Sequence, residues 1–286
     1  MGVSFQQSIN ILPQPIQPYL MDINRLIMKF IGFDNVYSIL LFGSYARGEY
    51  NANSDCDLLI ILKDEFLEEK PYSFMRKLEQ IFLSLEYKHQ LKFKRSNLIN
   101  SILNVVEKTT GMFVSHFLTR QSYWERQSFH RIFNVNRLLS ILLAPGDIVL
   151  KNMSNSYIVV YGENPKARFK SRIGFRQQFK SLLMNEFISI CSLAIYILGK
   201  TSIKYSMEAF KWSIRNSYLY MFDKPAELKR IMNFFKKTGI SQKTFEKFIR
   251  LRREFYPDIT FALKCPWLAL KIHLIALKYR KLYHKP

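Results

Sequence analysis

Apolar residues in the first hundred positions follow two periods, one typical of helices and one of buried strands. Leu20, Ile23 and Ile27 recur three or four residues apart, which predicts an amphipathic helix that ends near Ile31. The almost wholly apolar run at 36–42 predicts a strand that is covered on both faces. The same criteria predict a second buried strand at 55–62, a helix at 71–85 and a half-covered third strand at 86–93.

After residue 97 the pattern predicts mainly helices. A helical stretch at 97–143 precedes a turn at 144–146 and a short hairpin formed by 148–150 and 157–161. We expect an α+β fold in which a small mixed β-sheet flanked by helices is followed by an all-α helical domain. The first domain would span 1–150, with its core at about 20–95, and the second 151–286. The later helices are predicted at 166–198, 203–221, 226–238, 241–255 and 265–282.

Positive charge is concentrated in the predicted helical domain. Residues 1–150 hold 16 Lys and Arg against 14 Asp and Glu, a net +2, whereas 151–286 hold 27 against 8, a net +19. This excess indicates an anionic partner for the second half. Aromatic and basic residues are mixed at 167–180, 245–256 and 271–285, as in proteins that hold RNA by phosphate contacts and stacking. Amphipathic helices with a solvated basic face would produce the same mixture.

Cysteine usage and hydropathy bear on the compartment. The three cysteines, Cys56, Cys191 and Cys265, match no CxxC spacing and imply neither a zinc site nor a disulfide framework, which fits a reducing compartment. No signal peptide is expected, because the first residues lack a basic region followed by an apolar one. The longest apolar run, 187–198, is about twelve residues, short of the roughly twenty that a membrane span needs. We therefore expect a cytoplasmic protein with no membrane partner.

A candidate anion site follows the first predicted strand. Gly43 lets the backbone approach a ligand closely, and its neighbours offer backbone N–H groups. The Ser44 hydroxyl can hydrogen-bond a phosphate oxygen, and Arg47 adds a positive charge near the start of a short helix predicted at 45–49. The turn therefore predicts a cradle for phosphate groups.

Two carboxylates open the second predicted strand. Asp55 and Asp57 are two positions apart, so strand alternation places both on one face, within reach of one hard cation. Paired carboxylates and substrate phosphates are how Mg²⁺ is usually held, and such an ion polarises the phosphate and lowers the pKa of an attacking hydroxyl. A phosphate cradle followed by a metal-binding pair predicts phosphoryl or nucleotidyl transfer.

This stretch resembles the nucleotidyltransferase domain of the DNA polymerase beta superfamily, in the extended form of the minimal and antibiotic nucleotidyltransferases. The resemblance covers about residues 20–95 and implies that the enzyme uses Mg²⁺ or Mn²⁺ and an NTP, with ATP the first choice. It implies that Asp55 and Asp57 are catalytic and bind the metal, and that Gly43, Ser44, Arg47 and Ser54 bind the nucleotide. The matching residues are Gly43-Ser44, Ala46-Arg47-Gly48 and Ser54-Asp55-Cys56-Asp57-Leu58.

The family often has a third carboxylate on the next strand, and this sequence departs there. Gln90 stands about where that carboxylate would lie, and Glu86 has the same alternation phase and could substitute. Without a third carboxylate, either the second metal is weakly held or another residue acts as the base. Glu186 in the helical half is one candidate, although pairing with a basic neighbour such as Lys180 or Arg176 is the favoured explanation of this residue.

Two classes of function fit these observations. The first is a metal-dependent enzyme that moves a nucleoside monophosphate from an NTP to a hydroxyl of RNA (tRNA included), of a protein or of a small molecule; the +19 half favours RNA. A toxin or antitoxin component of a nucleotidyltransferase pair has the same motif. The alternative is a catalytically degenerate protein of this fold that binds nucleotide or nucleic acid without turnover. The acceptor, the NTP and the oligomeric state stay open.

Overall fold

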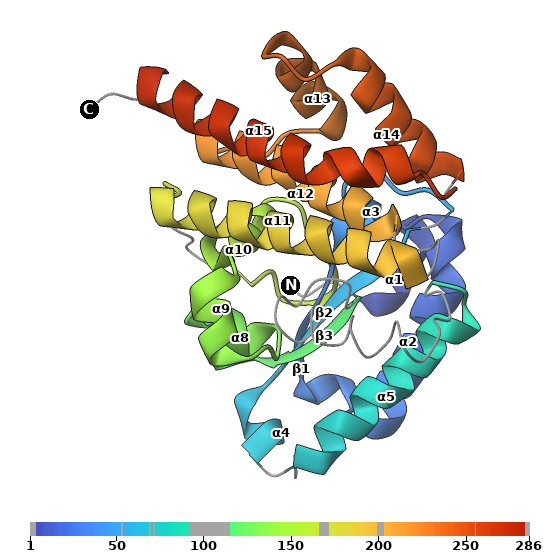
Figure 1. The fold of residues 1–286 in the computed structure, drawn as a ribbon. Helices are drawn as coiled ribbons and strands as arrows, with labels where there is room; N and C mark the ends of the chain where they lie inside the picture. Colours follow the sequence, from blue (N-terminus) through green and yellow to red (C-terminus); the bar gives the residue numbers. More distant parts are fainter. Residues whose placement is uncertain are drawn as a thin grey trace.

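A four-stranded sheet lies at the centre of the fold in the computed structural model (Figure 1). The structure describes residues 4–52, 54–68, 70, 72–91, 115–165, 172–198, 203–254 and 256–283. The strand order is β3-β2-β1-β4, with β2 and β3 parallel and the other neighbours antiparallel, so the predicted mixed sheet is confirmed. The strands are β1 (Val36–Phe42), β2 (Asp57–Leu62), β3 (His116–Arg120) and β4 (Ile158–Gly162).

Each face of the sheet is covered by its own group of helices, as strand alternation requires. Leu41, Leu58 and Ile60 pack against the N-terminal helices, whereas Leu40 and Leu59 pack on the opposite face against the helices that follow β3. The first group is α1 (Phe5–Ile11), α2 (Gln17–Phe30), α4 (Asp64–Glu68) and α5 (Tyr72–Lys88), with 3-10 turns at Gln14–Ile16 and Phe33–Asn35. The second is α7 (Gln121–Glu125), α8 (Phe129–Ile132) and α10 (Gly146–Ser154), while α9 (Arg137–Leu143) packs against α8 and α11.

The rest of the described chain is helical, as predicted, and has its own apolar core. The central helix is α12, which packs against both α11 and α15 (Figure 1). By length and composition, Phe175–Tyr196 and Ile259–Leu282 could each cross a membrane, and 39% of each apolar stretch is buried within the fold. The helices are α11 (Phe175–Leu198), α12 (Ile203–Phe222), α13 (Leu228–Lys237), α14 (Gln242–Glu254) and α15 (Ile259–Tyr283).

The third strand is not where the sequence pattern placed it. Helix α5 continues to Lys88, because Leu78, Phe82 and Glu86 recur four residues apart and all face the core. The residues 86–91 of the predicted strand therefore do not form one, 92 and 93 lie outside the described residues, and β3 lies at His116–Arg120. Of the helical stretch predicted at 97–143, residues 97–114 lie outside the described part of the chain.

The predicted hairpin is also wrong. Residues 148–150 lie within α10, and the strand expected at 157–161 is β4, whose partner is β1. In that pairing Ser38 lies opposite Gly162 and donates a 2.7 Å hydrogen bond to the Glu163 carbonyl. The sheet thus takes one strand from beyond residue 150. The division into domains at 150 and 151 stays a prediction.

Candidate active site

The turn after β1 and the start of β2 are in direct contact. Phe42 and Asp57 are cross-strand partners, so the next residue, Gly43, meets the Asp57 side chain. Gly43 has φ +75°, and a Cβ atom on it would lie 1.8 Å from Asp57 Oδ2. Only glycine fits there, for both its conformation and its size. The antiparallel pairing therefore brings together the two halves of the sequence motif.

Asp55 and Asp57 line one cleft, as predicted from their spacing. Burial, and then the neighbouring Asp55 charge, raise the pKa of Asp57 well above the usual aspartate range, while Lys211 and Arg47 act in the opposite direction. A bound cation would offset this repulsion and favour the ionised form of Asp57. The described residues contain no group of three or more His, Cys, Asp or Glu placed to hold a metal. A metal held here would take two protein carboxylates, with phosphate and water completing its shell, and this suits Mg²⁺.

The predicted phosphate-binding residues lie at different distances from this cleft. Gly43, Ser44 and Arg47 line it. The Ser44 hydroxyl oxygen is buried and has no hydrogen-bond partner in the described structure, so a ligand oxygen could pair with it. Ser54 lies instead in the loop before β2, where its hydroxyl accepts a 2.9 Å hydrogen bond from the Asn51 N–H. The nucleotide-binding roles of all four residues stay predictions.

Helix α12 forms the opposite wall of the cleft and supplies groups that the sequence motif does not include. Lys204, Glu208 and Lys211 are spaced for one helix face, and all three line the cleft. Lys204 Nζ lies 3.8 Å from Asp55 Oδ2, and Lys211 donates a 2.6 Å hydrogen bond to Glu208 Oε1. Burial lowers the pKa of Lys211, while Glu208 acts in the opposite direction. A third carboxylate is therefore present, but it comes from the helical half of the chain.

The third carboxylate expected at Glu86 or Gln90 is not in the cleft. Strand alternation puts His116, the partner of Leu58, on the sheet face opposite Asp57. Glu86 is buried on that far face, where its Oε1 lies 2.8 Å from His116 Nδ1. Gln90 follows the end of α5 with φ 57° and does not line the cleft. The prediction failed because it assigned 86–93 to a strand.

Glu186, the base considered from the helical half, also lies outside the cleft. It is partly buried on α11, and burial raises its pKa to about 7, although a hydrogen bond with the Leu270 backbone acts to lower it. Neither Lys180 nor Arg176 forms an ion pair with it in the described structure. Glu208 was missed because only tertiary packing shows that its face of α12 is turned toward Asp55 and Asp57.

Apolar side chains complete the cleft. Phe42 and Phe117 stack with ring centroids 6.2 Å apart, and Phe117 meets Phe133 edge-on at 4.8 Å. Such a wall can hold a flat ring, whether a nucleobase or an acceptor. The full apolar lining is Phe42, Phe117, Phe129, Phe133, Val149, Met153, Met184 and Trp212.

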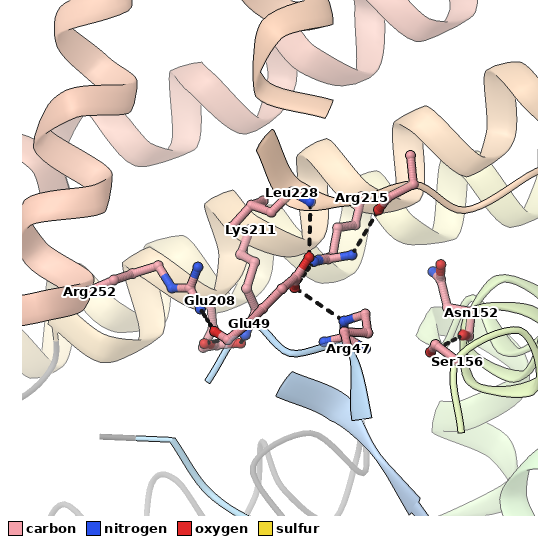
Figure 2. A network of polar contacts seen from close by, with 10 residues as sticks. Arg47, Glu49, Asn152, Ser156, Glu208, Lys211, Arg215, Leu228 and Arg252 are labelled. Carbon is pink, nitrogen blue, oxygen red and sulfur yellow. Dashed lines mark hydrogen bonds and ion pairs between the residues drawn. The ribbon is translucent and has the colours of Figure 1, made fainter. Parts of the chain in front are cut away.

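Glu49 ties the motif loop to the helical half (Figure 2). Its carboxylate forms ion pairs with Arg47, at 3.3 Å, and with Arg215, and accepts a 2.9 Å hydrogen bond from the Leu228 N–H. Arg252 donates a 3.2 Å hydrogen bond to the Glu49 carbonyl. Burial alone would raise the pKa of Glu49, but Arg215, the Leu228 N–H and Arg47 together lower it. Glu49 therefore fixes the loop that carries Arg47 against α12, α13 and α14.

The part of the chain that carries the glycine turn and the two aspartates matches a known protein family. Residues 24–108 match the family model of the nucleotidyltransferase domain. Among solved structures, the chain is similar in fold to the spectinomycin adenyltransferase AAD(9) from Enterococcus faecialis, determined with ATP and spectinomycin. That similarity has a TM-score of 0.51 at 11% identity and covers 91% of this chain and 98% of the other. No curated protein matches the sequence.

Proposed function

We propose that the protein is a metal-dependent nucleotidyltransferase that moves a nucleoside monophosphate from an NTP, with ATP the first choice, to a hydroxyl group. The observation that carries this proposal is the meeting of Asp55 and Asp57 with the unpartnered Ser44 hydroxyl in one cleft. The adenyltransferase of similar fold was solved with ATP and an acceptor molecule, which supports ATP. Asp55 and Asp57 would hold Mg²⁺ or Mn²⁺, which supplies polarisation of the phosphate and acidification of the acceptor hydroxyl.

The remaining side chains of the cleft have complementary roles in this proposal. Ser44, Arg47 and Lys204 bind and orient the triphosphate, because each presents a donor or a positive charge to the cleft. Glu208 takes the proton of the acceptor hydroxyl. The hydroxyl oxygen forms a bond to the α-phosphorus, the bond from that phosphorus to the bridging oxygen breaks, and pyrophosphate leaves. Lys211 holds Glu208 in place through its hydrogen bond.

The acceptor proposed first is RNA, with proteins and small molecules as the other acceptors to test. The net +19 of residues 151–286 supports an anionic acceptor. A filter-binding isotherm at two salt concentrations tests it, since affinity that rests on phosphate contacts falls steeply with salt. Affinity that is insensitive to salt would contradict the RNA acceptor and leave the transfer reaction itself untouched.

Label transfer tests the reaction. The protein is incubated with Mg²⁺, each α-³²P-labelled NTP in turn, and total RNA or cell lysate, beside the Asp55→Ala/Asp57→Ala variant. We expect labelled acceptor with the unchanged protein only. Transfer no greater than that of the double variant, on every acceptor, would support the alternative, a nucleotide-binding protein without turnover. The absence of a carboxylate on β3 is the observation that favours this alternative.

Glu208→Gln tests the proposed base. We expect kcat to fall about 100-fold or more, since general base catalysis typically contributes about 10² to 10⁴-fold, while KM for the NTP changes little. Glu254→Gln, on the exposed surface of α14, is the control and should leave both parameters unchanged. A kcat of Glu208→Gln within tenfold of that of the unchanged protein would assign the base elsewhere.

A further inference from the structure

Exposed apolar side chains gather on three helices of the described chain. Thirteen of the nineteen large apolar side chains that are exposed there belong to α9, α11 and α15. Helix α11 packs against both α9 and α15, so these side chains lie on neighbouring helices, and we call them together the α11–α15 face. Apolar patches of this extent mark interaction sites. The residues are Leu138, Ile141, Leu142, Phe175, Phe179, Leu183, Phe187, Ile190, Ile259, Leu263, Trp267, Leu274 and Leu282.

Helix α11 reverses the usual arrangement of a surface helix. Its outward residues Phe175, Phe179, Leu183 and Phe187 recur four apart and are 38–60% exposed. Its buried side instead carries polar residues that bond to other helices: Gln178 donates to Ser217 at 2.9 Å, Ser181 accepts from Asn216 at 2.9 Å, and Ser192 lies 2.7 Å from Ser206. A helix that faces water normally has the opposite polarity. The outward face of α11 is therefore suited to contact with an apolar partner.

The charge around this face favours an anionic partner over a second copy of the chain. Helices α11 and α15 carry seven basic residues, of which Arg280 is buried and pairs with Asp223, and one acidic residue, Glu186. Two such surfaces facing one another would repel. On α15, the exposed Lys264 and Lys278 lie beside the apolar stripe that contains Trp267, which is 65% exposed, and Lys271 between them donates a hydrogen bond to the Gly239 carbonyl. Tryptophan and lysine flanking an apolar stripe are typical of helices that lie in a membrane interface.

We propose that the α11–α15 face binds the surface of an anionic lipid membrane, with its apolar side chains among the acyl chains and its lysines at the headgroups. The two helices lie flat in the interface, because their inward faces are committed to α12. The proposed membrane binding replaces the expectation of no membrane partner, which depends on the length of the single apolar run at 187–198. It is independent of the proposed transfer reaction, since none of the thirteen exposed side chains lines the catalytic cleft.

Co-sedimentation with vesicles tests the proposal. The full chain is mixed with phosphatidylcholine vesicles that contain or lack phosphatidylglycerol. We expect at least tenfold tighter partitioning onto the anionic vesicles, and a blue shift of tryptophan emission that Trp267→Phe removes. Trp124, the reference fluorophore, is 1% exposed and should not respond. Equal partitioning onto both vesicle types, or none onto either, would overturn the proposal.

Paired variants separate the apolar and electrostatic contributions. Leu263→Glu/Trp267→Glu should weaken partitioning at least tenfold, whereas Ile11→Glu/Met28→Glu, with the same charge change at exposed apolar sites elsewhere, should have no effect. Lys264→Glu/Lys278→Glu should weaken it more than the matched Lys229→Glu/Lys243→Glu. Unaltered thermal midpoints verify folding.

The oligomeric state, measured by light scattering, tests whether a second copy of this chain covers the α11–α15 face instead of lipid. We expect a monomer in solution. A stable dimer that Leu263→Glu/Trp267→Glu dissociates would assign the face to self-association and overturn the proposal. Partitioning that ignores the apolar variants and follows charge alone would also overturn it, because the apolar face would then have no part in binding.

Discussion

Replacing Gly43 with alanine should abolish transfer at a modest cost in stability. The added Cβ would lie 1.8 Å from Asp57 Oδ2, whereas such contacts essentially never fall below 3.0 Å, so the carboxylate or the turn must move by at least 1.2 Å. A displacement of about 1 Å in a catalytic site can reduce the rate about 100-fold. We therefore expect kcat for nucleotidyl transfer to fall about 100-fold or more in Gly43→Ala.

Gly48→Ala is the matched control for this substitution. Gly48 also has a positive φ, +67°, but nothing lies within 4 Å of a Cβ placed there. Gly48→Ala should lose about 1–2 kcal/mol of unfolding free energy, because alanine disfavours the left-handed conformation, and Gly43→Ala should lose somewhat more, because its Cβ also overlaps Asp57. Only Gly43→Ala should lose activity. The assays are urea denaturation and label transfer at saturating NTP. A kcat of Gly43→Ala above a tenth of the normal value would show that Asp57 is not positioned by its close contact with the glycine turn.

Three further predictions concern stability. Glu49→Ala should lower the free energy of unfolding, measured by urea denaturation, by about 3–5 kcal/mol, because Arg215, which is 5% exposed, then has no buried partner. Glu254→Ala, at the exposed ion pair with Arg250, should not change that free energy measurably. Burial lowers the pKa of His273 to about 4, so below pH 6.5 the unfolded chain binds more protons than the folded one. The free energy of unfolding should therefore fall by up to about 3 kcal/mol as the pH drops from 6.5 to 4. His273→Gln should make the free energy of unfolding depend less on pH over this range. Mg²⁺ should raise the thermal midpoint, and the rise should grow with pH, because the pKa of Asp57 is raised and metal binding needs its ionised form. An equal rise in Asp57→Asn would refute this.

The part of the site that could be predicted from sequence is the part that local geometry determines. Gly43, Ser44 and Arg47 follow an apolar strand directly, and Asp55 and Asp57 obey strand alternation, so a short stretch of chain contains all the relations between them. One antiparallel pairing, Phe42 with Asp57, then brings the two groups together. The fold class could be predicted for the same reason, since the long helices and buried strands carry strong periodic signals.

The parts that failed depend on contacts distant in sequence. The residues 86–88 alternate like a strand, yet they continue α5 because Glu86 lies against His116, thirty positions later. The strand at 157–161 was matched with a near neighbour, while its actual partner β1 lies more than a hundred residues earlier. Pairing choices of this kind follow from tertiary packing, which a local pattern does not contain.

The cleft that contains Asp55 and Asp57 has one wall from each half of the chain, and this bears on how the proposed enzyme would work. The motif wall carries the carboxylate pair, while α12 supplies Lys204, Glu208 and Lys211. A change in the angle between the walls would move Glu208 relative to Asp57 and leave each wall intact. Glu49 opposes such a change, because it joins the motif loop to α12 through Arg215 and to α13 through the Leu228 N–H. Loss of Glu49 should therefore separate the proposed base from the proposed metal ligands before it disrupts either half of the fold.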